Sequence, residues 1–178
     1  MAFAHSVRKS ISSCSTFFAV PNFKNSEAAM ENLIMNPQWR PGPDGNPMYF
    51  SGNGLTYDKR IYQGNRTCSI SRMETSPEPG LISYDPPIVV AGKSAVVWGF
   101  YIRAVEASNI ILTADFYNEE GMLLKKFHQP IAQRVTAEFK PVTCRFPIPL
   151  HAHIVHLSMQ FNGKVTACTF FLPTAYLV

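Results

Sequence analysis

Apolar and polar side chains alternate on both sides of Asn162-Gly163 in residues 153–178. Alternation with a period of two is typical of a β-strand that packs one face on a core. An Asn-Gly pair tolerates positive φ at both positions, which makes it a strong signal for a two-residue hairpin loop. The sequence therefore predicts an antiparallel hairpin in which Phe161 faces Lys164.

Similar alternating segments recur along the chain, with almost no helical periodicity. In residues 95–104 and 109–117 every second side chain is apolar, so one face of each strand is expected in a core. Residues 75–87 contain several prolines, which predicts a loop or an edge segment because proline cannot donate to a strand ladder. The other expected strands are residues 32–39, 47–51, 66–72, 122–127 and 135–146. A total of roughly eight to ten short strands predicts an all-β fold, a two-sheet antiparallel jelly-roll β-sandwich.

The inner faces of these strands are expected to hold both tryptophans, Trp39 and Trp98. Three of the four cysteines, Cys68, Cys144 and Cys168, also take core-side positions, where a free cysteine packs as a small hydrophobe. Because no C-x-x-C spacing occurs, a zinc site is not expected.

The residues before the first expected strand lie outside the regular series of alternating segments. We therefore divide the chain into an N-terminal arm, 1–31, and a sandwich domain, 32–178. The arm carries an isolated cysteine and several apolar side chains: Cys14, Phe17, Phe18, Val20 and Phe23. Two interpretations stay open. The arm folds back on its own domain, or it docks on a neighbouring subunit by adding a strand to an exposed sheet edge.

Composition excludes several classes of partner. Charged residues make up 16% of the chain and the net charge is +4, without any run of more than two basic residues, so nucleic acid is not an expected partner. No apolar stretch approaches the length of a membrane span. The Ser-rich segment after Lys9 lacks a signal-peptide cleavage site, so classical secretion is not expected and the location stays open.

The sequence contains no convincing catalytic or metal-binding set. Glu119 and Glu120 are adjacent in a predicted turn, where nothing makes them converge as the paired acids of a hydrolase do. On a strand, His151 and His153 would share a face and His156 would take the opposite one. We therefore expect no enzyme activity, no metal and no cofactor.

The order of several motifs resembles the carbohydrate-binding jelly-roll modules that are appended to xylanases and glucanases. The motifs are NLIMNPQW at 32–39, YQGNRTCSI at 62–70, PIVVAGK at 87–93, SAVVWGFYIRA at 94–104, DFYNEEG at 115–121 and FPIPLHAHIVHLSMQFNG at 146–163. The resemblance covers residues 32–178 and implies the same fold. Those modules often hold a structural Ca²⁺ through acidic residues, but this chain has Arg40 and Leu172-Pro173-Thr174 at the matching places. The resemblance therefore does not carry a calcium site to this chain.

The resemblance also directs attention to the outward side chains of three strands. Glycans are held by planar aromatic side chains and by hydrogen-bonding side chains along a sheet. If strands 95–104, 109–117 and 153–161 share one sheet, their outward residues form one patch. This candidate glycan-binding patch consists of Tyr101, Arg103, Thr113, Asp115, Tyr117, His156, Ser158 and Gln160.

Two hypotheses for the function follow. The first, which we favour from sequence, is a non-catalytic structural subunit that assembles with copies of itself into a fibre, coat or shell, with the arm docking on the next copy. The alternative is a module that binds a polysaccharide on the polar sheet face.

Overall fold

The computed structural model describes residues 31–178, and for residues 59–61 it describes the backbone alone. Eleven strands and one 3-10 helix are present in this part of the chain. They are β1 (Phe50–Asn53), β2 (Thr56–Tyr62), β3 (Asn65–Arg72), β4 (Gly80–Val89), β5 (Ala95–Arg103), β6 (Glu106–Ala107), β7 (Ile110–Tyr117), β8 (Leu123–Pro130), η1 (Ala132–Arg134), β9 (Lys140–Pro147), β10 (Ile154–Phe161) and β11 (Val165–Leu177). No helix in the described range has the length and apolarity that crossing a membrane requires.

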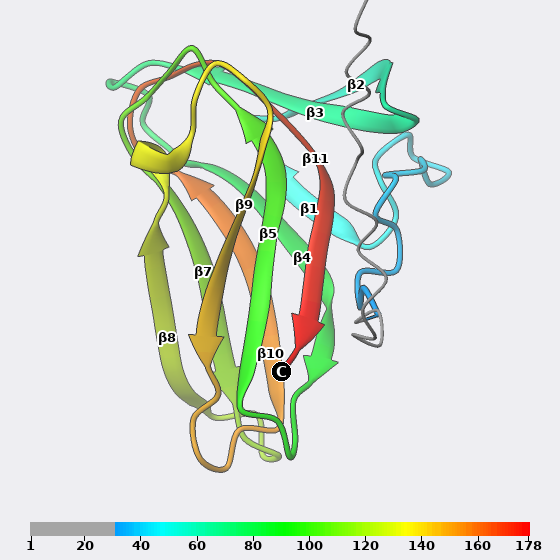
Figure 1. The fold of residues 1–178 in the computed structure, drawn as a ribbon, viewed down its shortest axis with the longest axis vertical. Helices are drawn as coiled ribbons and strands as arrows, with labels where there is room; N and C mark the ends of the chain where they lie inside the picture. The colour runs from blue at the N-terminus through cyan, green and yellow to red at the C-terminus, as the bar shows by residue number, and fades with distance from the viewer. Residues whose placement is uncertain (1–30) are drawn as a thin grey trace, which may run out of the picture.

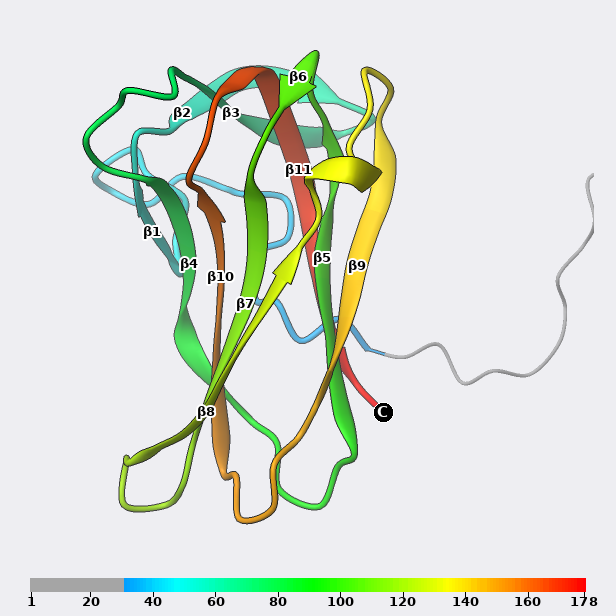
Figure 2. The same cartoon turned by 90° about the vertical axis from the view of Figure 1, so that its left-hand side faces the viewer.

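The strands form two antiparallel sheets that face each other (Figures 1 and 2). One sheet has the order β1-β4-β10-β7-β8, and the other has the order β2-β3-β11-β5-β9 with β6 attached to β11. This arrangement confirms the predicted two-sheet jelly-roll β-sandwich.

Period-two alternation places the apolar faces of both sheets in one interior. On β7 and β10 every second side chain is fully buried: Ile110, Leu112, Ala114, Phe116, Val155, Leu157, Met159 and Phe161. On β5 the inner residues are Val96, Trp98, Phe100 and Ile102. The predicted inner faces of these strands are confirmed, and so is the burial of Cys68, Cys144 and Cys168 as free thiols.

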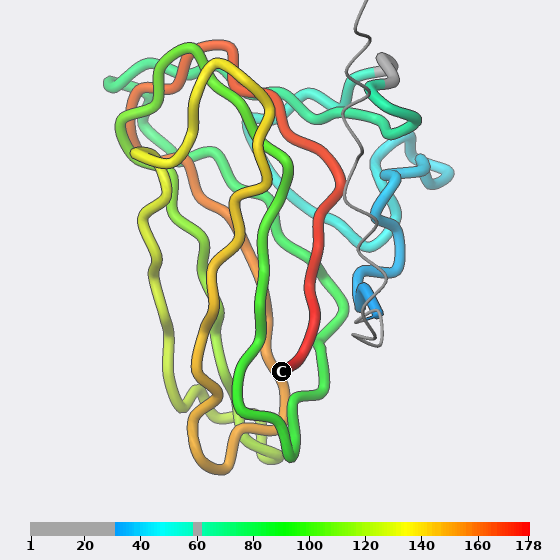
Figure 3. The backbone as a smooth tube through the Cα atoms, viewed as in Figure 1, coloured from blue at the N-terminus to red at the C-terminus, as the bar shows by residue number. Residues whose placement is uncertain are grey.

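The strand predicted at residues 32–39 is wrong, because no strand forms here and the second half of the segment, from Asn36, is a turn. The side chain of Asn36 closes the turn: its Nδ2 donates to the Arg40 carbonyl and its Oδ1 accepts from the Arg40 N–H, both at 2.9 Å. The turn inserts Trp39 into the core, where its ring lies 5.4 Å from that of Phe170. Upstream, the Leu33 N–H donates to the Ala175 carbonyl, so the segment runs beside β11 (Figure 3).

The predicted hairpin at Asn162-Gly163 is also wrong, because β10 and β11 belong to different sheets. β10 pairs with β4 and β7, whereas β11 pairs with β3, β5 and β6. Neither Asn162 nor Gly163 has the positive φ that a type I′ turn needs. Instead the chain turns a corner from one sheet to the other, and the Asn162 N–H donates to the Asn109 carbonyl at 3.0 Å.

The proline-rich stretch 75–87, predicted as a loop or an edge segment, contributes most of strand β4. This strand lies between β1 and β10. Pro86 and Pro87 lie beyond the residues that pair with β1 and at the place where the register with β10 shifts. A bulge tolerates the missing N–H groups, so the prolines do not exclude a strand inside the sheet.

Candidate functional site

The outer face of the five-stranded sheet is lined by short polar side chains. Strand register places Ser158 directly between Ser83 on β4 and Thr113 on β7. The neighbouring row places His156 opposite Asp115. The alternation that buries the apolar residues of β7 and β10 therefore also collects hydroxyl, imidazole and carboxylate groups on the solvent side.

A shallow cavity of about 230 Å³ opens at the centre of this face. Its polar lining comes from β4, β7 and β10, and the residues around it are Ser83, Tyr84, Asp85, Asp115, His156, Leu157 and Ser158. The hydroxyls of Thr113 and Ser158 hydrogen-bond to each other beside it. The His156 ring stands edge-on to Tyr117, with ring centroids 5.4 Å apart.

Asp115 is the most distinctive group of this cavity. Its Oδ2 accepts an ion pair from the Lys126 ammonium at 2.8 Å, which raises the pKa of Lys126 through hydrogen bonding and charge attraction. Its other oxygen, Oδ1, is buried and has no hydrogen-bond partner among the described residues. A buried carboxylate oxygen without a donor is costly, so a rotation of the Asp115 side chain that brings this atom to a donor in the cavity is favourable.

The structure divides the predicted patch between the two outer faces. Tyr101 and Arg103 lie on β5, which pairs with β9 and β11, so they are on the opposite side of the sandwich from the cavity. Their assignment to one patch with β7 and β10 is therefore wrong. The members that do share the five-stranded face are Thr113, Asp115, Tyr117, His156, Ser158 and Gln160. Ser83 and Asp85 also line this face, but the sequence pattern does not indicate them, because it predicts a loop or an edge segment for their strand.

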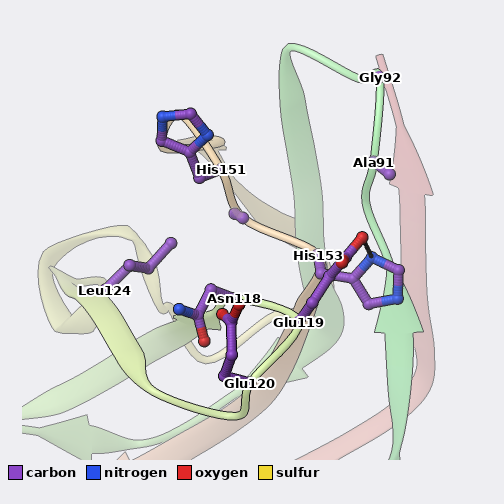
Figure 4. Close-up of a pocket in the computed structure, with 9 residues that line it drawn as sticks. Ala91, Gly92, Asn118, Glu119, Glu120, Leu124, His151 and His153 are labelled. Atoms are coloured by element: carbon purple, nitrogen blue, oxygen red, sulfur yellow. Dashed lines mark ion pairs between the residues drawn. The ribbon is translucent and has the colours of Figure 1, made fainter.

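The larger cavity of about 620 Å³ lies at one end of the sandwich, between the loops that join β4 to β5, β7 to β8 and β9 to β10 (Figure 4). Glu119 and His153 approach each other there, with Oε1 and Nδ1 3.7 Å apart. His151 sits in the loop before β10 with a φ of 67°, while His156 lies on the sheet face. In residues 31–178 no group of three His, Cys, Asp or Glu side chains is arranged to hold a metal ion.

A third cavity, of about 290 Å³, lies on the outer face of the six-stranded sheet. Arg103 lines it, together with Asp58, Tyr62, Thr67, Ser69, Phe139 and Thr169. Of these residues, only Arg103 belongs to the patch predicted from the sequence. Tyr62 and Phe139 come from distant strand ends, and no local pattern shows that they meet.

The side chains predicted to form a docking arm, Cys14, Phe17, Phe18, Val20 and Phe23, lie outside the described residues. The docking of the arm is therefore not tested by this structure.

No protein-family model matches the sequence, and no curated protein matches it. Solved structures do match. The CBM22-1 xylan-binding domain of Paenibacillus barcinonensis Xyn10C has a TM-score of 0.51 at 14% identity, covering 86% of this chain and 98% of that domain. The family 11 carbohydrate-binding module of Lic26A-Cel5E from Clostridium thermocellum has a TM-score of 0.53 at 12% identity. This match covers 85% of this chain and 97% of that module.

Larger proteins also contain this fold. The enzymatically active domain of bacteriophage CBA120 tailspike protein 4 has a TM-score of 0.61 at 12% identity, and the match covers 83% of this chain. The chain spans only 21% of that structure, and 26% of an arabinose-bound GH51 α-L-arabinofuranosidase. At such identities the comparisons show the fold alone. They confirm that the chain has the jelly roll of carbohydrate-binding modules, as the order of its motifs predicted.

Proposed function

We propose that this chain binds a polysaccharide, without catalysis, through the outer face of the five-stranded sheet. The observation that carries the proposal is Asp115, which lines the cavity of this face and whose buried Oδ1 has no donor among the described residues. Sugar hydroxyl groups are donors of the kind that this oxygen requires. The fold supports the proposal, because solved structures of matching length include a xylan-binding domain and a module in complex with β-1,4-galactotriose.

The surroundings of Asp115 fit an uncharged sugar chain. Ser83 and Ser158 present hydroxyls, which donate and accept, and His156 adds a half-exposed imidazole. Tyr117 supplies an aromatic ring beside His156, against which the apolar face of a sugar can pack. The cavity is open and lies along a sheet, so a chain can pass across it without presenting an end.

Affinity electrophoresis of the full chain in gels that contain xylan or β-1,4-galactan tests the proposal. Asp115→Asn keeps the shape of the side chain but removes its charge, and we expect it to lower affinity about tenfold. Glu106→Gln is a matched control, because Glu106 also pairs with a lysine, Lys164, at 2.8 Å but lies on the other sheet. Unchanged mobility of the wild-type chain in every glycan gel, or equal retardation of both variants, would reject this site.

The assembly hypothesis concerns a different part of the molecule. It depends on the N-terminal arm, residues 1–31, and Glu31 is the only arm residue that the structure describes. The assembly hypothesis therefore stays a prediction.

A further inference from the structure

The floor of the cavity on the six-stranded sheet is a row of hydroxyl groups that crosses neighbouring strands. Ser69 on β3 lies opposite Thr169 on β11, and their hydroxyl oxygens are 3.4 Å apart. Thr67 and Ser69 both donate to Oδ2 of Asp58, which stands at the β2 end of the row. Neither bond uses Asp58 Oδ1. That oxygen remains able to accept a hydrogen bond from a ligand.

Aromatic side chains that come from the two edges of the six-stranded sheet, near β2 and β9, meet beside this row of hydroxyl groups. Tyr62 ends β2 and Phe139 precedes β9, yet their ring centroids are 4.5 Å apart. Both rings pack on Phe171, at 5.3 Å and 5.1 Å, and Phe171 stacks on Tyr101. Phe171 is only 1% exposed although strand register places it on the outer face, so Tyr62 and Phe139 cover it. The cavity therefore has aromatic walls and a polar floor.

Arg103 stands at the other end of the row from Asp58. Strand register puts it directly opposite Thr169. Its Cζ lies over the Phe139 ring, 4.9 Å from the ring centre, so the guanidinium is held against an aromatic surface. Among the described residues Arg103 has no ion pair, and its side chain makes no hydrogen bond. A guanidinium whose N–H groups are free pairs best with a carboxylate, which it can hold through two parallel hydrogen bonds.

We propose that this cavity is a second binding site, separate from the one around Asp115, and that it takes a sugar ring bearing a carboxylate, that is, a uronic acid. Arg103 binds the carboxylate, and Asp58 and Thr169 hydrogen-bond to ring hydroxyls. The sugar ring lies against the exposed side of Tyr62. A volume of about 290 Å³, near the lower end of the range for ligand cavities, accommodates one sugar unit.

Two-dimensional amide NMR of the full chain tests this site with four probes: glucuronic acid, galacturonic acid, and their neutral parents glucose and galactose. We expect at least one uronic acid to shift the amides around Ser69, Arg103 and Thr169, with an affinity about tenfold or more above that of its neutral parent. Equal binding of acid and parent would overturn the proposal. So would the absence of shifts with both acids, or shifts confined to the five-stranded sheet.

Variants assign the effect to individual groups. Arg103→Gln should lower uronic acid affinity about tenfold, while Arg103→Lys keeps the charge but loses the paired hydrogen bonds and should fall between Gln and wild type. Asp115→Asn should leave uronic acid binding unchanged, so failure of this site and failure of the five-stranded site are distinguished. If Arg103→Gln folds and binds the acid as wild type does, the proposal is wrong. Should Arg103→Gln not fold, wild-type affinity in Arg103→Lys would overturn the proposal equally.

Discussion

The rings of Phe161 and Phe170 lie with their centroids 5.6 Å apart, although the consecutive strands that carry them, β10 and β11, belong to opposite sheets. The contact therefore spans the interior of the sandwich and does not run along a hairpin. Phe170 also meets Trp39 at 5.4 Å and Phe100 at 5.4 Å, so it stands at the centre of an aromatic cluster that joins both layers.

Truncation of this central ring should be severe. Phe170 is fully buried, and Phe170→Ala should lower the free energy of unfolding by ~3–5 kcal/mol, because transfer free energy is lost and a cavity remains. Urea unfolding followed by tryptophan fluorescence measures the change. Leu150→Ala is the control, because Leu150 is 82% exposed and its truncation should change stability by less than about 0.5 kcal/mol. A similar small loss for Phe170→Ala would contradict the burial of this ring between the two sheets.

The corner at Gly163 should tolerate no side chain. A Cβ at this position would collide with Ser108 Oγ and would lie 3.2 Å from the Asn109 backbone N. Gly163→Ala should therefore destabilise the protein by ~1–3 kcal/mol through overpacking.

Because the nearest obstacle is a hydroxyl, the double variant Gly163→Ala/Ser108→Ala should lose less stability than the sum of the two single variants. Denaturant unfolding of the four proteins completes the cycle. Strict additivity would show that the Ser108 hydroxyl is not the obstacle.

Stability should fall in mildly alkaline solution. Burial raises the pKa of Cys168 from 9.0 to about 12 and also raises the pKa of Cys68. Above pH 9.0 the unfolded chain loses these protons while the folded chain keeps them, so the unfolded state becomes more favourable. We expect a loss of ~1.4 kcal/mol per pH unit for each such thiol.

Unfolding measured under reducing conditions at several pH values checks this slope. Cys168→Ala should reduce the slope by the contribution of one thiol. The pKa of Tyr57 is raised from 10.0 to about 12, mainly by burial, so its contribution begins only at higher pH. A slope that is the same in Cys168→Ala and wild type would show that Cys168 does not cause it.

The arm hypothesis makes its own prediction. If residues 1–25 dock on a neighbouring copy, their deletion should convert an assembly into a monomer, as measured by light scattering. Within the described chain β8 forms the edge of its sheet and pairs with β7 alone, so its free side is one place where an added strand finds backbone partners. Cys14→Ser in the full chain separates docking from disulfide linkage. Monomers for both full-length and shortened chains would end the hypothesis.

Local alternation was informative because burial of one strand face is a property of neighbouring residues. It identified the inner sides of β5, β7 and β10, and it placed Trp98 and Cys168 in the core correctly. It failed at residues 32–39, where the Asn36 side chain closes a turn, and in β4, where a bulge accommodates Pro86 and Pro87. Both errors arose where side-chain hydrogen bonding or a register shift overrides the simple pattern.

For the candidate sites, the sequence indicated which side chains point outward but not which strands lie together. Asp115 and His156 were placed on one face correctly, whereas Arg103 was assigned to that face and lies on the other. The partners of Arg103 in its cavity, Tyr62 and Phe139, come from elements far apart in the chain.

The sequence by itself determined that the chain is a two-layered β-protein with a continuous apolar interior. The alternation of apolar and polar side chains indicates which face of each strand is buried. Only the tertiary structure decided which strands pair, where the chain changes sheet, and hence which polar groups share a cavity. Strand partners are chosen by the joint packing of residues distant in sequence, and no short stretch of the chain carries that information.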